Sequence, residues 1–290
     1  MKPNWMIIGA AKAGSSSLAY GLGTHPDVFL TEPKETHFFA RDEEYQRGLA
    51  FYEAHYDGAA NFKARGEASN NYTMKEVWPH AAQRIHDFNP DLKLIYIVRE
   101  PFSRIASWWV DCRSWGSGDR AHYDFKTALR LNAPFLIDST NYGAQLDHYL
   151  QLFPERQTLV LFMEDLNRQP QSVYRRCFEF LGVDPAHEVP PEVSYINATG
   201  DRRMVAPLHS KLRENRLYRA AMKLVPQGAR AAVLKAGPVR KVMTTKQDKP
   251  VWDAQAVQIV RDRLGDAPAR FLERFGKPAD FWPAAPKLNA

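Results

Sequence analysis

Short apolar runs recur along the chain, and each is followed by a helix signal. Runs rich in apolar, β-branched and aromatic residues lie at Trp5–Gly9, Leu92–Val98 and Thr158–Met163, with a weaker one at Lys63–Ala68. Runs of this kind are typical of strands covered on both faces, as in a parallel sheet whose crossovers are helices. The pattern therefore predicts an α/β fold with a central, mainly parallel β-sheet flanked by helices.

Helical patterns occupy the intervals between these runs. They are expected at Ser15–Leu22, about Pro79–Phe88, Pro101–Cys112, Phe125–Leu131, Asn141–Phe153 and Ser172–Leu181. The serines of the first helix can serve its N-terminal amides, and Gly182 is placed to end the last helix. Ligands of such sheets bind at the carboxyl ends of the strands, so the loops after Gly9, after Val98 and around Glu67 should converge there.

The pattern changes after about Val189. Prolines are followed by basic helical stretches, expected at Leu208–Leu224 and Ala254–Phe275. We expect one domain over residues 1–290, with its core at 4–185 and a closing helix within 253–282. The basic helical region at about 205–246 is expected to be a subdomain or a lid over the site.

Composition favours an anionic ligand but excludes only some classes. Lysine and arginine number 39 against 33 acidic residues, and the formal charge of +6 fits an anionic ligand, a polyanionic partner or simple solubility. Only two cysteines, Cys112 and Cys177, and nine scattered histidines occur. Neither a disulfide scaffold nor a metal centre is therefore expected, and the cytoplasm is the expected location. No run approaches the roughly 20 apolar residues of a membrane span, and the run after Met1 is too short for a signal peptide.

A loop suited to phosphate follows the first run. It reads Gly9-Ala-Ala-Lys-Ala-Gly-Ser-Ser-Ser17, so small residues lie where backbone must approach a ligand, and three hydroxyls begin the next helix. Amides and the helix dipole favour an anion there, and Lys12 can reach it as a point charge. The glycines have P-loop spacing, but Ser15 stands where that motif has lysine. Arg99 follows the second run without a magnesium-binding aspartate, so metal-dependent nucleotide hydrolysis loses support.

Two segments resemble the donor-binding motifs of sulfotransferases that use 3′-phosphoadenosine 5′-phosphosulfate (PAPS). Lys12-Ala-Gly-Ser-Ser-Ser17 resembles their K-x-G-[ST]-[ST] loop. Arg99-Glu-Pro-Phe-Ser-Arg-Ile-Ala-Ser107 is similar to their R-[DE]-P-x-x-R-x-x-S segment, whose first arginine and last serine hold the donor's 3′-phosphate. An arginine at a strand end and a serine within the following helix can grip one phosphate from two directions. The resemblance implies a P-loop-like three-layer fold with a helical C-terminal region.

Two further segments resemble the branch that contains the heparan sulfate sulfotransferases and many bacterial relatives. Pro33-Lys-Glu-Thr-His-Phe-Phe39 is similar to its E-x-H-F-F segment, and Gly66-Glu-Ala-Ser-Asn-Asn-Tyr72 to its G-E-x-[ST]-x-x-Y segment. The chain departs from the branch at Ala68, where lysine is frequent. It also departs in a K-G-R-type loop for the 3′-phosphate, which is not intact here.

The resemblance implies a role for each motif. The 5′-phosphosulfate would be bound by Ala11, Lys12, Ala13, Gly14, Ser15, Ser16 and Ser17. The 3′-phosphate would be held by Arg99, Ser107 and Lys246, with Lys249 or the pair Arg202-Arg203 competing for the last place. Lys12 would also stabilise charge on the bridging oxygen. Glu35 would be the general base. In an extended segment the side chain of His37 faces the same way, so His37 would orient the acceptor, share the charge or be the base itself. Glu67 is left out of the catalytic set, because a strand-end glutamate can simply bond backbone amides.

The function expected from the resemblance is a bacterial, cytoplasmic, metal-independent sulfotransferase that uses PAPS and releases 3′-phosphoadenosine 5′-phosphate (PAP). The acceptor would be a small molecule or carbohydrate: a hydroxyl, rather than an amine, of a carbohydrate, glycolipid or secondary metabolite. Its binding would involve the loop at Asp111–Tyr123, with Trp108, Trp109 and Trp115 nearby, and region 205–246 as a lid or acceptor-binding insertion. Two alternatives stay open: a P-loop kinase or nucleotide hydrolase, and a non-enzymatic basic protein that binds polyanions. No nucleic acid partner is expected.

Overall fold

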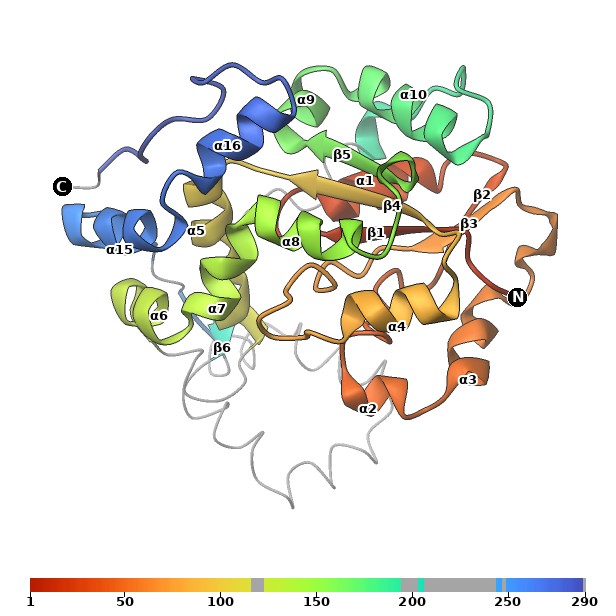
Figure 1. Ribbon diagram of the computed structural model, residues 1–290, viewed down its shortest axis with the longest axis horizontal. Coiled ribbons are helices and arrows are strands. Elements are labelled where there is room, and N and C mark those ends of the chain that lie inside the picture. The colour runs from red at the N-terminus through yellow and green to blue at the C-terminus, as the bar shows by residue number, and fades with distance from the viewer. Residues whose placement is uncertain (116–122, 194–202, 206–243, 247–248, 289–290) are drawn as a thin grey trace.

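The computed structural model describes residues 1–115, 123–193, 203–205, 244–246 and 249–288 (Figure 1). Its centre is a five-stranded sheet in the order β2-β3-β1-β4-β5. The strands are β1 (Trp5–Gly9), β2 (Val28–Leu30), β3 (Ala64–Glu67), β4 (Lys93–Val98) and β5 (Thr158–Phe162). Every neighbouring pair is parallel. The predicted α/β class and parallel sheet are confirmed.

The helices alternate with the strands along the chain. They are α1 (Ser15–Leu22), α2 (Asp42–Tyr45), α3 (Leu49–Glu53), α4 (Ala81–Phe88), α5 (Pro101–Trp115), α6 (Phe125–Leu131), α7 (Ala133–Leu136), α8 (Tyr142–Leu150), α9 (Met163–Arg168), α10 (Pro170–Leu181), α15 (Ala254–Leu264) and α16 (Ala267–Arg274). Short 3-10 turns are η1 (Ala54–Tyr56), η2 (Ala59–Asn61), η4 (Asp138–Thr140), η5 (Glu155–Gln157) and η6 (Pro191–Val193).

The sheet lies between two apolar layers, because successive side chains of a strand point to opposite faces. On β1, Met6 and Ile8 pack into a core shared with α4, α8 and α16. Trp5 and Ile7 pack into a second core shared with α1 and α10. Both cores are covered by helices (Figure 1), so the predicted three-layer arrangement is confirmed.

A third apolar cluster lies beside the carboxyl end of β4. It joins α5, α6, α7 and α15, with Trp252 packed edge-on against Phe102 and Phe125. Helix α5 begins directly after the strand because the carboxylate of Glu100 accepts the amides of Phe102 and Ser103 at 2.7 and 2.6 Å. This cluster confirms the predicted helical C-terminal region and sets α5 next to the phosphate-type loop.

Several local predictions were wrong. The edge strand β2 was not predicted, since three residues give too little pattern. The closing helix expected over Ala254–Phe275 is two helices, because the chain turns at Gly265, whose φ is 54°. The N-cap of α1 is Gly14, which has no side chain, so no serine hydroxyl caps that helix. The helix expected at Leu208–Leu224 lies outside the described residues.

The ends of the basic region form strands rather than helices. The strands β6 (Arg203–Val205) and β7 (Thr244–Lys246) pair antiparallel, with Arg203 opposite Lys246. Strand β6 lies against α5. Across the portion of the chain that the structure describes, no helix combines the length and apolar character needed to cross a membrane.

Candidate active site

The loop between β1 and α1 is shaped by left-handed backbone. Lys12 has φ 66° and Gly14 has φ 92°, a conformation that costs glycine nothing. Ala11 and Ala13 are fully buried, so the loop is packed from behind. The first amides of a helix have no intrahelical acceptors, and here they belong to Ser15, Ser16 and Ser17. The amides at the start of α1 are compatible with the predicted anion cradle, which stays a prediction, while the amide of Ala13 donates to the carbonyl of Ala10 at 3.2 Å.

Two arginines of the β4–α5 segment reach the carbonyls of this loop. Arg99 donates from Nη1 to the carbonyl oxygen of Lys12 at 3.3 Å. Arg104 donates from Nε to the carbonyl oxygen of Ala11 at 2.9 Å. The backbone of Arg99 is itself fixed, since Tyr142 donates its hydroxyl to the Arg99 carbonyl at 2.6 Å. The motif resemblance implied a role for Arg99. Arg104 lies within the same motif, but the resemblance implied no role for it.

The remaining residues predicted for the donor are less closely gathered. Ser107 lies half-buried on α5, two turns beyond the end of β4. Lys246 is the last residue of β7, whose partner strand lies against α5. Lys249 lies just beyond that strand, and Arg202 is outside the described residues.

Lys12 is engaged by an acidic residue that sequence reasoning placed only at the edge of an acceptor loop. Its Nζ donates to Oδ1 of Asp111 at 3.0 Å, with both side chains largely buried. Asp111 lies on α5 one helical turn beyond Ser107. The two residues therefore lie on the same face of the helix, which faces the loop. Nothing in the spacing of the sequence indicated this pair.

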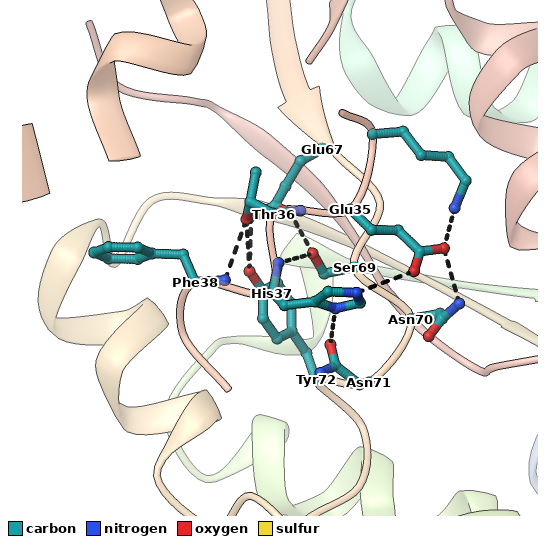
Figure 2. A network of polar contacts seen from close by, with 10 residues as sticks. Glu35, Thr36, His37, Phe38, Glu67, Ser69, Asn70, Asn71 and Tyr72 are labelled. Atoms are coloured by element: carbon teal, nitrogen blue, oxygen red, sulfur yellow. Dashed lines mark hydrogen bonds and ion pairs between the residues drawn. The ribbon is translucent and has the colours of Figure 1, made fainter. Parts of the chain in front are cut away.

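Glu35 and His37 meet as a pair (Figure 2). Nε2 of His37 lies 3.4 Å from Oε2 of Glu35, while the other oxygen of Glu35 accepts from Asn70 at 2.9 Å and from Lys34. Both side chains are half-buried. Their proximity was predicted, but the reason was wrong: the segment is not extended at His37, whose φ is 54°.

The electrostatic surroundings keep His37 neutral. Burial, followed by the nearby guanidinium of Arg41, lowers the pKa of His37 below its usual 6.5, against the opposing effects of Asn71 and Glu35. Nδ1 of His37 lies 3.0 Å from Oδ1 of Asn71. A neutral ring carries one proton and can donate in only one of its two contacts, whereas a protonated ring donates in both. Protonation of His37 would therefore add a hydrogen bond, whereas burial and Arg41 favour the neutral ring.

Glu67 anchors the segment that carries this pair (Figure 2). Its Oε2 accepts from the amide and hydroxyl of Thr36 at 3.3 and 2.8 Å, and from the hydroxyl of Ser69 at 2.5 Å. The Ser69 oxygen in turn accepts the amide of His37 at 2.9 Å. Oε1 accepts the hydroxyls of Tyr52 and Tyr72 at 2.9 and 2.8 Å. Glu67 is completely buried, so it cannot meet an acceptor molecule, although it bonds four hydroxyls rather than only backbone amides.

The tryptophans near the predicted acceptor loop serve packing where they are described. Trp109 is buried in the third core, and its Nε1 donates to the carbonyl of Tyr123 at 3.3 Å. Trp108 stacks on Phe135 with the ring centres 5.2 Å apart. Most of the loop at Asp111–Tyr123 and the side chain of Trp115 lie outside the described residues.

The described portion of the chain holds no group of three or more histidine, cysteine, aspartate or glutamate side chains able to bind a metal ion. The two cysteines are separate thiols: Cys177 is buried, and burial raises the pKa of Cys112 to about 12. Neither is suited to metal or redox chemistry at neutral pH.

Several known proteins are similar to this chain over about two thirds of its length. The model of the sulfotransferase domain family matches residues 2–199. Heparan sulfate glucosamine 3-O-sulfotransferase 6 of Homo sapiens is 30% identical over 204 residues, which are 68% of this chain and 56% of that protein. The bifunctional heparan sulfate N-deacetylase/N-sulfotransferase 3 of Mus musculus is 26% identical over 68% of this chain and 24% of its own length.

A solved sulfotransferase from Alicyclobacillus acidocaldarius is similar in structure. It has a TM-score of 0.52 and 32% sequence identity, over 67% of this chain and 88% of that one. The chain thus spans 56% and 24% of the two curated relatives but most of the bacterial one. Because the family model matches more than half of the chain, over residues 2–199, the chain belongs to the sulfotransferase family.

Proposed function

We propose that this chain transfers the sulfuryl group of PAPS to a hydroxyl group of an acceptor and releases PAP. The observation that carries the proposal is the position of Lys12, ahead of Gly14 in the loop that opens α1, with its carbonyl held by Arg99 at 3.3 Å. A kinase-type P-loop needs lysine where this chain has Ser15. A lysine that precedes the second glycine of the loop suits a phosphosulfate, because its ammonium group can stabilise the charge that develops on the bridging oxygen.

The donor would lie across the carboxyl ends of β1 and β4. The backbone of Ala11, Ala13 and Gly14, with the amides and hydroxyls of Ser15, Ser16 and Ser17, would bind its 5′ end. Arg99, Ser107 and Lys246 would hold its 3′-phosphate. The proposal for Lys246 is supported by the backbone, because β7 pairs with β6 and β6 lies against the helix that carries Ser107.

The Glu35–His37 pair would act as the general base. It receives the proton of the acceptor hydroxyl while the acceptor oxygen forms a bond to sulfur. The bond between sulfur and the bridging oxygen breaks, and its electron pair goes to the 5′-phosphate, where Lys12 stabilises the charge. The neutral state of His37 supports this role, since protonation lets the ring donate to both Glu35 and Asn71. Because the two groups interact, the proton belongs to the pair.

A carbohydrate is the acceptor class that the comparisons favour, because similar proteins are heparan sulfate sulfotransferases. A glycolipid or a secondary metabolite with a free hydroxyl is the alternative. Region 205–246 as a lid or acceptor-binding insertion, the single-domain organisation, the independence from metal and the cytoplasmic location stay predictions.

Calorimetric titration tests the donor. The protein in EDTA is titrated with PAP, and separately, with magnesium, with ATP. We expect affinity for PAP in the micromolar range, about −8 kcal/mol, and much weaker binding of ATP. Preference for magnesium-ATP would replace the proposal with a kinase. If the protein does not bind PAP but binds polyanions, with an affinity that falls steeply as salt is raised, it would be a polyanion-binding protein.

A further inference from the structure

Arg104 is a buried cation whose bonding partners are all neutral. It lies on α5 and is completely inaccessible to solvent. Its Nε donates to the carbonyl of Ala11 at 2.9 Å. Its Nη1 donates to the carbonyl of Leu136 at 3.2 Å and to the hydroxyls of Ser139 and Thr140 at 2.8 and 2.6 Å. Its Nη2 is buried and has no partner among the described residues.

This guanidinium carries an uncompensated charge within the described part of the chain. Burial lowers the pKa of Arg104, and the groups that act on it electrostatically are Tyr142, Tyr96 and Cys112, all neutral at pH 7. Arginine nevertheless stays protonated in proteins. A buried charge without a counter-ion is costly, and a fold keeps one where something compensates it.

The contact with Ala11 links the buried charge of Arg104 to the phosphate-type loop, where a bound anion would compensate it. Arg104 and Arg99 hold the carbonyls of two successive loop residues, Ala11 and Lys12. A carbonyl tied back by a cation polarises the peptide that follows it, and its N–H becomes a better donor. The N–H that follows the Lys12 carbonyl belongs to Ala13 and donates to the carbonyl of Ala10 at 3.2 Å. The loop therefore has a positive charge behind it, bonded to the carbonyls of Ala11 and Lys12.

We propose that Arg104 is a positioning residue for the donor: from behind the loop it orients Ala11 and supplies the charge that the 5′-phosphosulfate compensates, without touching the ligand. This inference rests on the proposed function for the identity of the ligand. A purely structural reading is the competitor, in which Arg104 only joins α5 to Leu136 and the η4 turn.

The two adenosine monophosphates, compared with PAP, distinguish the positioning role from the purely structural role. PAP, adenosine 5′-monophosphate and adenosine 3′-monophosphate are titrated into the native protein and into Arg104→Met and Arg104→Lys. Arg104→Met removes the charge behind the loop and the bond that orients Ala11, so we expect it to weaken PAP and the 5′-monophosphate by about 10- to 100-fold. The 3′-monophosphate should change by less than about 2-fold, because Arg104 acts through the Ala11 carbonyl of the loop assigned to the 5′ end.

Arg104→Lys keeps the charge but loses the planar fork. It should weaken the two 5′-phosphate ligands by about 3- to 10-fold and spare the 3′-monophosphate. If Arg104→Met does not fold, the comparison of Arg104→Lys with the native protein is sufficient to test the inference. The double variant Ser139→Ala/Thr140→Val is the matched control: it removes the hydroxyl partners of Nη1 and leaves the charge and the Ala11 contact. It should lower the melting temperature and change PAP affinity by less than about 3-fold.

Equal weakening of all three ligands, or none, in Arg104→Lys would overturn the inference and leave the structural reading. Failure of the native protein to bind PAP, with preference for magnesium-ATP, would instead remove the proposed function. The same variants titrated with ATP would then still report on Arg104, since ATP also places its phosphates at the 5′ position.

Discussion

Lys12 and Asp111, 99 residues apart in the chain, form an ion pair of 3.0 Å at the mouth of the phosphate-type loop, with side chains only 15% and 11% exposed. Opposite charges in a poorly solvated place interact strongly, so Asp111 competes with a bound anion for Lys12. The acidic partner also places a negative charge beside the proposed donor.

Asp111→Asn should therefore tighten PAP binding. The amide keeps the shape and can still accept from Lys12, while the repulsion disappears, and we expect a gain of about 3- to 10-fold by calorimetry. The gain should shrink as salt is raised, because screening weakens the repulsion in the native protein. A loss of affinity would show instead that Asp111 holds Lys12 in its working orientation.

Lys12→Ala should reduce turnover far more than donor affinity. The charge of Lys12 matters most as the leaving oxygen develops charge, so we expect kcat to fall by about 100- to 1000-fold. PAP affinity should change by less than about 10-fold. Lys63, a surface lysine paired with Asp27, provides the control, since Lys63→Ala should leave both quantities unchanged. Unchanged turnover in Lys12→Ala would remove this residue from the mechanism.

His37 predicts how stability depends on pH. Its folded-state pKa is lowered by burial and by Arg41, so the unfolded chain binds the proton first as pH falls. Its contribution to stability is complete above about pH 6.5 and is lost as pH falls through that value toward the folded pKa. His37→Asn tolerates the left-handed backbone. Urea unfolding of both proteins between pH 7 and pH 5 should show the native protein losing more stability than the variant. Parallel losses would contradict the lowered pKa.

Glu67→Gln should disturb both stability and the base. Five donors from four residues surround the carboxylate, and an amide NH2 would face some of them. We expect unfolding to become easier by about 2–4 kcal/mol in urea. We also expect a lower kcat with PAP affinity retained, since Thr36 and His37 lose their anchor. Glu179→Gln on the exposed side of α10 should change stability by less than about 0.5 kcal/mol. Equal effects of Glu67→Gln and Glu179→Gln on stability and kcat would contradict the anchoring role of Glu67.

Gly66→Ala should damage the centre of the sheet. A Cβ at Gly66 would lie 2.3 Å from the backbone oxygen of Trp5 and equally close to its ring, so β1 and β3 must separate. We expect a loss of about 3 kcal/mol or more by urea unfolding. Gly143→Ala is the control: its Cβ would meet only Phe271 at 3.9 Å, and in a helix this change should stabilise by up to about 1 kcal/mol.

The fold was predictable wherever a run of neighbours carries the signal. Apolar runs predict β1, β4 and β5, and Glu100-Pro101 predicts the start of α5. β2 and the β6–β7 pair were missed because three-residue strands are created by their partners rather than by their own composition. The division of the closing helix at Gly265 depends on one left-handed residue.

The candidate site divides in the same way. Lys12, Glu35, His37 and Arg99 were proposed as site residues because each lies in a short motif. The structure brings Arg99 to the Lys12 carbonyl and His37 to Glu35. Asp111 and Arg104 were missed as partners of the loop, and the bonds that reveal them span 99 and 93 residues. No local spacing records such a distance.

The sequence by itself determined the chemical groups available to the site and the order of strands and helices, because motif spacing and hydrophobic period are short-range properties of the chain. Only the tertiary structure decided what each charged side chain contacts: Asp111 contacts Lys12, Glu67 contacts Thr36, and Arg104 contacts the carbonyl of Ala11. Those contacts follow from the position of α5 against the loop after β1 and from the pairing of β3 with β1. Burial then strengthens them, since water no longer screens them.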